Sequence, residues 1–66
     1  MKNRLKEIRA QKKMTQETLA AKAKISRTSL ALIETEKTTP DGETIAKLVK
    51  ALEMPASDIF FDLGVV

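Results

Sequence analysis

The same start signal for a helix occurs twice in this chain, about eleven residues apart. In each copy a hydroxyl residue, Thr15 or Ser26, is suited to cap a helix, because its side-chain oxygen accepts a hydrogen bond from a free backbone N–H. Apolar residues flank each cap at the spacing of a hydrophobic staple, Met14 with Leu19 and Ile25 with Leu30. Residues 15–34 therefore predict two short helices joined by a tight turn, a helix-turn-helix pattern.

Further helices are predicted on both sides of that unit. Residues 2–12 place apolar side chains three apart among charged ones, which is typical of an amphipathic helix with Asn3 as a suitable cap. Residues 36–42 contain proline and glycine and form the one real loop. The next helix carries the clearest apolar stripe, Ile45, Leu48, Val49 and Leu52, after a suitable cap at Asp41. With a last turn at 57–61, we predict an all-α fold, a compact five-helix bundle forming one domain over residues 1–66.

Composition excludes several classes of site. The 66 residues include no cysteine and no histidine, so no disulfide is possible and a structural metal site is not expected. We find no catalytic arrangement of side chains and predict neither an enzyme nor a cofactor. No apolar run approaches the ~20 residues of a membrane span, and the first residues lack the apolar middle of a secretion signal. We therefore expect a cytoplasmic protein with no membrane partner.

Charge is distributed unevenly along the chain. Residues 1–33 contain nine lysines and arginines against two glutamates, whereas residues 34–66 contain three lysines against seven acidic residues. The first half is therefore basic (+7) and the second acidic (−4). A basic half indicates either a polyanion partner or a solvated lysine-rich surface, and charge alone does not decide between them. The acidic half would stay away from phosphates and is available for contacts with another protein.

The residue pattern becomes more specific than a bare pair of helices. The segment TQ-x-x-LA-x-x-x-x-IS-R-x-x-L-x-x-IE, from Thr15 to Glu34, is followed by a loop with proline and then by the apolar stripe. This combination, over about residues 2–61, resembles the Cro/repressor helix-turn-helix family, the Xre-type short transcriptional regulators. The resemblance implies a lambda-repressor-like DNA-binding domain. It also implies a sequence-specific repressor that binds a palindromic operator in double-stranded DNA as a homodimer.

The resemblance also assigns roles to residues of the two helices. Gln16 matches a glutamine that contacts a phosphate, in agreement with the affinity of helix N-termini for anions. Arg27 and Thr28 match base-reading positions. Arg27 is suited either to a guanine edge or to a phosphate, while Thr28 offers a hydroxyl to a base or a methyl to thymine. Ser29 is expected to contact a phosphate.

Leu32 departs from the family pattern, which often has a polar side chain there. It packs on a thymine methyl, meets a protein, or extends the core, and these alternatives remain open. After the second helix, Lys37, Thr38 and Thr39 match a loop whose backbone N–H groups and side chains clasp a phosphate. Lys37 also has the simpler interpretation of a solvated lysine.

Arg9 and Glu34 match a structural ion pair of the family, which joins the first helix to the end of the recognition helix.

A second departure from the family pattern, after Leu32, concerns the turns, because the family commonly has glycine just after each of its first four helices. This chain has Lys13, Lys24, Glu36 and Glu53 there. A left-handed backbone at such positions would cost on the order of 1 kcal/mol each.

The end of the chain is more apolar than 66 residues easily bury alone. We therefore predict that residues 59–66 form a dimerisation tail, with Phe60, Phe61, Leu63 and Val65 at the interface. Of the two phenylalanines we expect one inward and one at the interface. The alternative function is a protein-binding module of the same fold, an antitoxin or antirepressor, and a regulatory protein partner is compatible with either function.

Overall fold

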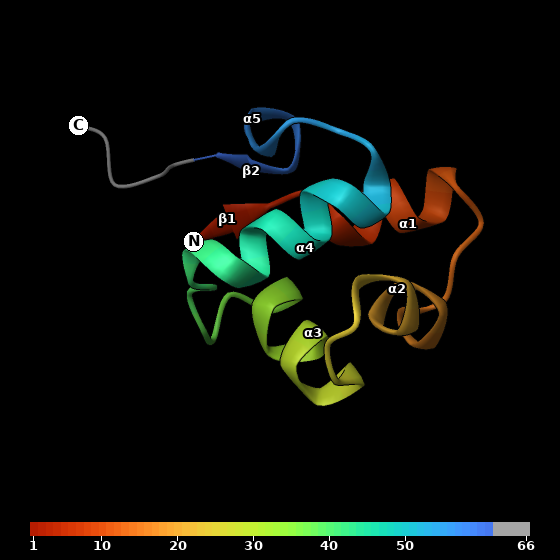
Figure 1. Ribbon diagram of the computed structural model, residues 1–66, viewed down its shortest axis with the longest axis horizontal. Coiled ribbons are helices and arrows are strands. Elements are labelled where there is room, and N and C mark those ends of the chain that lie inside the picture. The colour runs from red at the N-terminus through yellow and green to blue at the C-terminus, as the bar shows by residue number, and fades with distance from the viewer. Residues whose placement is uncertain (62–66) are drawn as a thin grey trace.

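The computed structural model describes residues 1–61 and contains five helices and a pair of very short strands (Figure 1). In chain order the elements are β1 (Lys2–Asn3), α1 (Leu5–Gln11), α2 (Gln16–Ala23), α3 (Arg27–Glu34), α4 (Gly42–Leu52), α5 (Ala56–Ile59) and β2 (Phe60–Phe61). The predicted all-α, five-helix fold is confirmed, and the strand pair is a small addition to it. The two predicted helices of the helix-turn-helix are α2 and α3.

The prediction of a helix from residue 2 is wrong at its start. Lys2 and Asn3 form a strand that pairs antiparallel with β2, Lys2 opposite Phe61 and Asn3 opposite Phe60. Asn3 still helps to start α1, because its side-chain oxygen accepts a hydrogen bond from the N–H of Leu5 at 3.0 Å. The strand forms through contact with a segment at the other end of the chain. The spacing of apolar residues within 2–12 cannot predict this pairing, because the partner strand lies about 58 residues later in the sequence.

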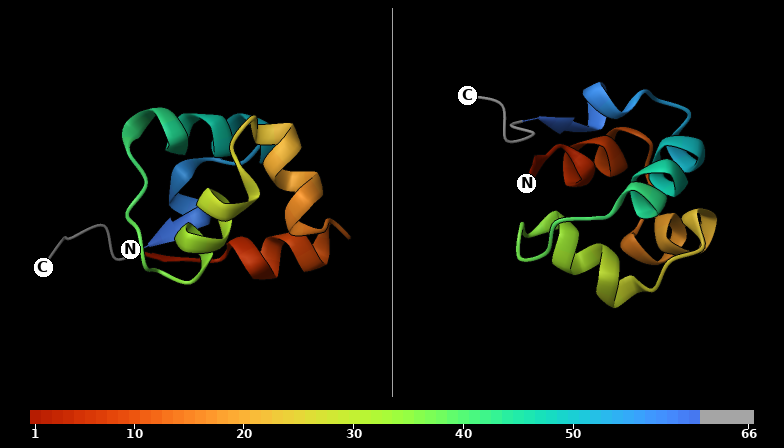
Figure 2. Two further views of the ribbon diagram at one scale, coloured as in Figure 1. Left: turned by 90° about the horizontal axis from the view of Figure 1, so that it is seen from below. Right: turned by 60° about the vertical axis from the view of Figure 1, so that its left-hand side comes forward.

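The core lies where the five helices meet; α4 crosses in front of it in Figure 1 and runs along one edge of the molecule in the left view of Figure 2. Every helix and β2 contribute fully buried side chains, among them Leu5, Leu19, Leu30, Leu48, Leu52, Ile59 and Phe60. Of the predicted stripe in α4, Leu48 and Leu52 are buried, while Ile45 and Val49 are partly buried against the core. No helix within residues 1–61 is long and apolar enough to cross a membrane.

The four turn positions where the family commonly has glycine are left-handed. The φ angles are 56° at Lys13, 59° at Lys24, 64° at Glu36 and 54° at Glu53. Side chains larger than glycine rarely adopt this conformation, because the Cβ atom crowds the backbone. The turns therefore keep their geometry despite their sequence, and each stores strain on the order of 1 kcal/mol.

Candidate nucleic-acid interface

Both helices of the helix-turn-helix begin at the predicted caps. The Thr15 hydroxyl accepts from the N–H of Thr18, and the Ser26 hydroxyl accepts from the N–H of Ser29, each at 3.0 Å. A second hydroxyl contact reinforces each cap, because Thr15 bonds the Thr18 side chain and Ser26 donates to that of Ser29. The start of α3 is therefore fixed by local chemistry, with Arg27 as its first residue.

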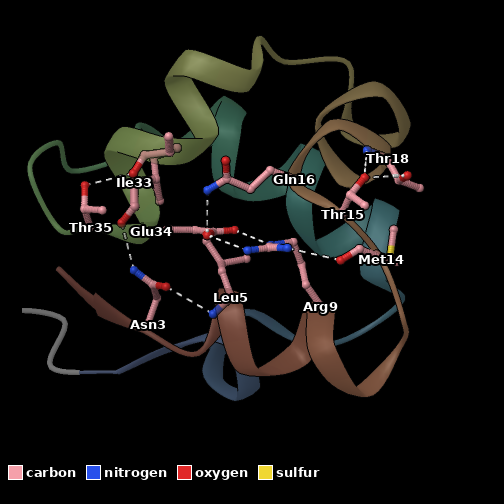
Figure 3. Close-up of polar contacts among 11 residues, drawn as sticks. Asn3, Leu5, Arg9, Met14, Thr15, Gln16, Thr18, Ile33, Glu34 and Thr35 are labelled. Atoms are coloured by element: carbon pink, nitrogen blue, oxygen red, sulfur yellow. Dashed lines mark hydrogen bonds and ion pairs between the residues drawn. The ribbon is translucent and has the colours of Figure 1, made fainter.

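The C-terminal end of α3 is fixed by a cluster of polar side chains from other elements (Figure 3). Arg9 of α1 donates to both carboxylate oxygens of Glu34, from Nε at 2.6 Å and from Nη2 at 3.0 Å. Its Nη1 also donates to the carbonyl of Met14. The Glu34 side chain is only 4% exposed and that of Arg9 14%. The hydrogen bond that Arg9 donates to Glu34 raises the pKa of the Arg9 guanidinium, so Arg9 stays charged.

Gln16, the first residue of α2, belongs to the same cluster. Its side-chain Nε2 donates to Oε1 of Glu34 at 3.0 Å. A primary amide carries two N–H donors, so this bond uses one of them and holds the other in a fixed direction. Gln16 also lines a hollow that opens beside the start of α2. The side chain expected to contact a phosphate is thus tied at one donor to the end of α3.

The outer face of α3 carries the residues expected to read DNA. Arg27, Thr28 and Ser29 are exposed, and Leu32 is 38% exposed. Leu32 is one of two large hydrophobic side chains that are exposed within residues 1–61, and Phe61 is the other. Leu32 is therefore more than an extension of the core, and its side chain is accessible to DNA or to a protein.

Two hollows lie on opposite sides of α3. The first, which we name the Arg27 hollow, has a volume of about 560 Å³ and is lined by Arg9, Met14, Thr15, Gln16, Glu17 and Arg27. The second, the Leu32 hollow, has a volume of about 360 Å³ and lies between α3, the α3–α4 loop and the start of α4. Ser26, Ser29, Thr38 and Thr39 contribute hydroxyls to it, Lys24 and Lys47 contribute positive charge, and Asp41 contributes a carboxylate. The Leu32 hollow therefore presents hydroxyls and lysines beside α3, whereas the Arg27 hollow contains Arg27 itself, Glu17 and the Arg9 that is paired with Glu34.

The α3–α4 loop differs from the expectation in one respect. The N–H groups of Lys37 and Thr38 both donate to the carbonyl of Leu32, at 2.9 and 3.2 Å. The N–H of Glu36 donates to the carbonyl of Ile33. These bonds close the end of α3, so the backbone of Lys37 and Thr38 does not present free donors to a phosphate. Their side chains are exposed and remain available.

Sequence reasoning missed the second role of Asn3. Its Nδ2 donates to the carbonyl of Ile33 at 2.9 Å, across 30 residues of sequence. The carbonyls in the last turn of a helix lack partners within that helix, and Asn3 supplies one of them. An asparagine near the start of a helix signals only a local cap. The hydrogen bond from Asn3 to Ile33 depends on the position of β1, which is set by pairing with β2 and not by neighbouring residues in the sequence.

The predicted dimer tail must also be corrected. Phe60 is 1% exposed, because its side chain lies in the core of its own chain. It therefore does not offer a surface to a second copy, contrary to the expectation. Phe61 points outward at 40% exposure, and the Arg4 guanidinium lies 5.2 Å from the centre of its ring. Leu63 and Val65 lie outside the described residues.

A comparison with known protein families agrees with this geometry. The family model described as helix-turn-helix matches residues 5–59, from the start of α1 to the end of α5. No curated protein matches the chain closely enough to count as a relative. The match covers more than half of the chain and includes both capped helices and the Arg9–Glu34 pair. The chain therefore belongs to the Cro/Xre-type helix-turn-helix family of DNA-binding regulators.

Proposed function

We propose that the protein is a sequence-specific repressor, which binds a palindromic operator as a homodimer with α3 in the major groove. The observation that supports this most directly is the position of α3. Its exposed face carries Arg27, Thr28 and Ser29, and it lies between the Arg27 hollow and the Leu32 hollow. A helix in the major groove has a phosphate backbone on each side, so a reading helix needs this arrangement.

The proposed contacts divide into positioning and reading. Gln16 and the free N–H groups at the start of α2 hold one backbone, using the second amide donor that Glu34 leaves unused. The side chains of Lys37 and Thr38, with Ser29, hold the other backbone. Arg27 and Thr28 read base edges, and Leu32 packs against a thymine methyl.

Dimerisation follows from the small footprint of one recognition helix. A two-fold dimer reads two half-sites about one helical turn, ~34 Å, apart. We propose that the interface includes the outward face of β2, where Phe61 is exposed beside Arg4. Leu63 and Val65 continue the chain from this point, and in this proposal they extend the interface.

The function is tested by selecting bound duplexes from a random pool at two salt concentrations. A repressor of this kind enriches a palindrome, and its affinity falls steeply as salt rises because bound phosphates release counterions. If no palindrome is enriched and affinity does not depend on salt, the protein is not a DNA-reading regulator. It is then the alternative protein-binding module, for which exposed Leu32 on the outer face of α3 is the supporting observation.

Base reading by Arg27 has its own test. Arg27→Ala should lower affinity for the selected site by about 1–3 kcal/mol and relax the preference at one base pair in each half-site. Lys6→Ala is the matched control, because it removes an exposed positive charge from α1 and lines neither hollow. If the Arg27 variant binds more weakly but selects the same bases, Arg27 holds a phosphate.

The dimer is tested by sedimentation of Phe61→Ala and of a chain that ends after Phe61. Both variants keep Ile59 and Phe60, which are buried and needed for folding. Both should shift the protein toward the monomer at a concentration where the unaltered chain is dimeric. Leu32→Ala is the control, since it removes the other large hydrophobic side chain that is exposed within residues 1–61 and should leave the dimer intact. An unchanged dimer in both test variants would place the interface elsewhere.

A further inference from the structure

Four lysines surround a third hollow, which neither the reading face nor the dimer accounts for. This lysine hollow has a volume of about 260 Å³ and lies between the end of α2 and the middle of α4. Its lining consists of Lys22, Ala23, Lys24, Lys47, Lys50 and Ala51. The floor is made of small, buried alanines, so a partner can approach the helices closely. A folded chain would not gather like charges around one hollow for its own stability, because they repel.

Little negative charge offsets these lysines. Glu43 contacts Lys47 with an Nζ–Oε1 distance of 3.5 Å, one turn away along α4. The Glu43 side chain is 78% exposed and that of Lys47 40%, so the pair is weak and screened by water. The hollow therefore has a net positive charge, and an anionic partner fits it.

The lysine hollow is continuous with the flank of the recognition helix. Lys24 and Lys47 line both the lysine hollow and the Leu32 hollow, which contains Ser26 and Ser29 of α3. Lysines therefore line a path from the side of α3 to Lys22 and Lys50, and Asp41 is the one acidic residue within 1–61 that lines either hollow. Figure 1 shows the helices that carry these residues, with α4 running past both α3 and α2. A DNA backbone that leaves the reading helix on this side would meet these lysines.

We infer that the lysine hollow is a second phosphate-binding surface, which holds the DNA backbone just outside the bases read by α3. This inference rests on the proposed DNA-binding function. The chemistry favours DNA over an acidic protein, because protein interfaces are depleted of lysine and enriched in aromatic side chains. The hollow has four lysines and no aromatic or large apolar residue. Lysines act as point charges and hold phosphates without reading sequence.

The inference is tested with the double substitution Lys22→Gln and Lys50→Gln, which alters the two lysines that line the lysine hollow but not the Leu32 hollow beside α3. Two duplexes are compared, the selected operator trimmed to its half-sites and the same operator extended by about one helical turn, ~10 base pairs, on each side. On the extended duplex the variant should bind at least roughly tenfold more weakly at about 0.1 M salt. Its slope of log affinity against log salt should fall by about 2. Binding to the trimmed duplex should be unchanged.

Lys6→Gln with Lys12→Gln is the matched control, because it removes the same charge from exposed positions that line none of the three hollows. It should affect the two duplexes equally. If the Lys22 and Lys50 variant loses equal affinity on both duplexes, or loses none on either, the inference is overturned. In the second case the hollow is a solvated surface or binds an acidic protein. Failure of the proposed DNA-binding function is distinguishable from failure of this inference, because in the first case the unaltered protein itself enriches no palindrome.

Discussion

Glu34 joins three helices through one carboxylate. It lies at the end of α3 and accepts hydrogen bonds from Arg9 of α1 and Gln16 of α2. At 4% exposure little water competes for its oxygens, so each bond is stronger than a surface contact. The cluster therefore sets the direction of the recognition helix and, through Gln16, the position of a proposed phosphate contact.

Replacement of Glu34 by glutamine should destabilise the protein by about 2–3 kcal/mol. The amide keeps the shape of the side chain but leaves the Arg9 guanidinium with no opposite charge, and such a loss costs about 3–5 kcal/mol in full burial. Our value is lower because the Arg9 side chain retains 14% exposure. The free energy of unfolding in urea is the measurement.

The same substitution at Glu43 serves as the control. Glu43 pairs with Lys47 across one exposed turn of α4, so Glu43→Gln should change stability by less than about 0.5 kcal/mol. Equal effects of the two substitutions would mean that the Arg9–Glu34 pair contributes no more than a surface contact.

Left-handed turn residues offer a way to stabilise the chain. Glu53 is exposed with φ of 54°, and glycine adopts this conformation without strain. Glu53→Gly should therefore raise the free energy of unfolding by about 0.5–1 kcal/mol, after allowing for the greater freedom of glycine in the unfolded chain. Ala46→Gly, at an exposed helical position of α4, should lower it by about 1 kcal/mol. A loss of stability in both variants would show that the turn at Glu53 is unstrained.

At the scale of the elements, the helices begin where local chemistry places them. Thr15, Ser26 and Asp41 each accept a hydrogen bond from the N–H three residues later. These caps were predictable because both partners lie within four residues of each other. For α4 the bond has an electrostatic consequence, because the N–H of Thr44 lowers the pKa of the Asp41 carboxyl below its ordinary value.

The cap of α4 makes stability depend on pH. A lowered pKa in the folded state means that the ionised carboxylate stabilises the fold at pH values above the ordinary pKa of about 4. This contribution is lost as pH falls through the lower folded value. Asp41→Asn keeps a capping oxygen but does not titrate. Its midpoint of thermal unfolding should therefore lie below that of the unaltered chain at pH 6, and the difference should shrink toward pH 2. A constant difference would contradict this.

At the scale of the whole molecule, the two ends of the described chain close the fold together. β1 and β2 pair with each other, and the N–H of Arg4 donates to the carbonyl of Ile59 at 2.8 Å. Because alternate residues of a strand face opposite sides, Phe60 enters the core while Phe61 points outward. One element therefore serves both the core and the proposed interface.

Phe60→Ala and Phe61→Ala should have very different effects on folding. Removal of the buried Phe60 ring should cost about 3–5 kcal/mol, which is much of the total stability of ~3–10 kcal/mol expected for a domain of this size. Phe61→Ala should cost less than about 1 kcal/mol when measured at a dilution where the chain is monomeric. Equal costs would contradict the strand register of β1 and β2.

The sequence by itself determined the five helices, three of their caps and the helix-turn-helix pattern, because these depend on residues a few positions apart. It also paired Arg9 with Glu34, but only through the family pattern. That the turns at Lys13, Lys24, Glu36 and Glu53 are left-handed was decided by the structure, since none of these residues favours that conformation. The tertiary structure alone decided the strand pair, the bond from Asn3 to Ile33, the tie between Gln16 and Glu34, and the burial of Phe60 rather than Phe61. Each of these joins segments separated by many residues. Such contacts arise from how the helices pack, which no local spacing encodes.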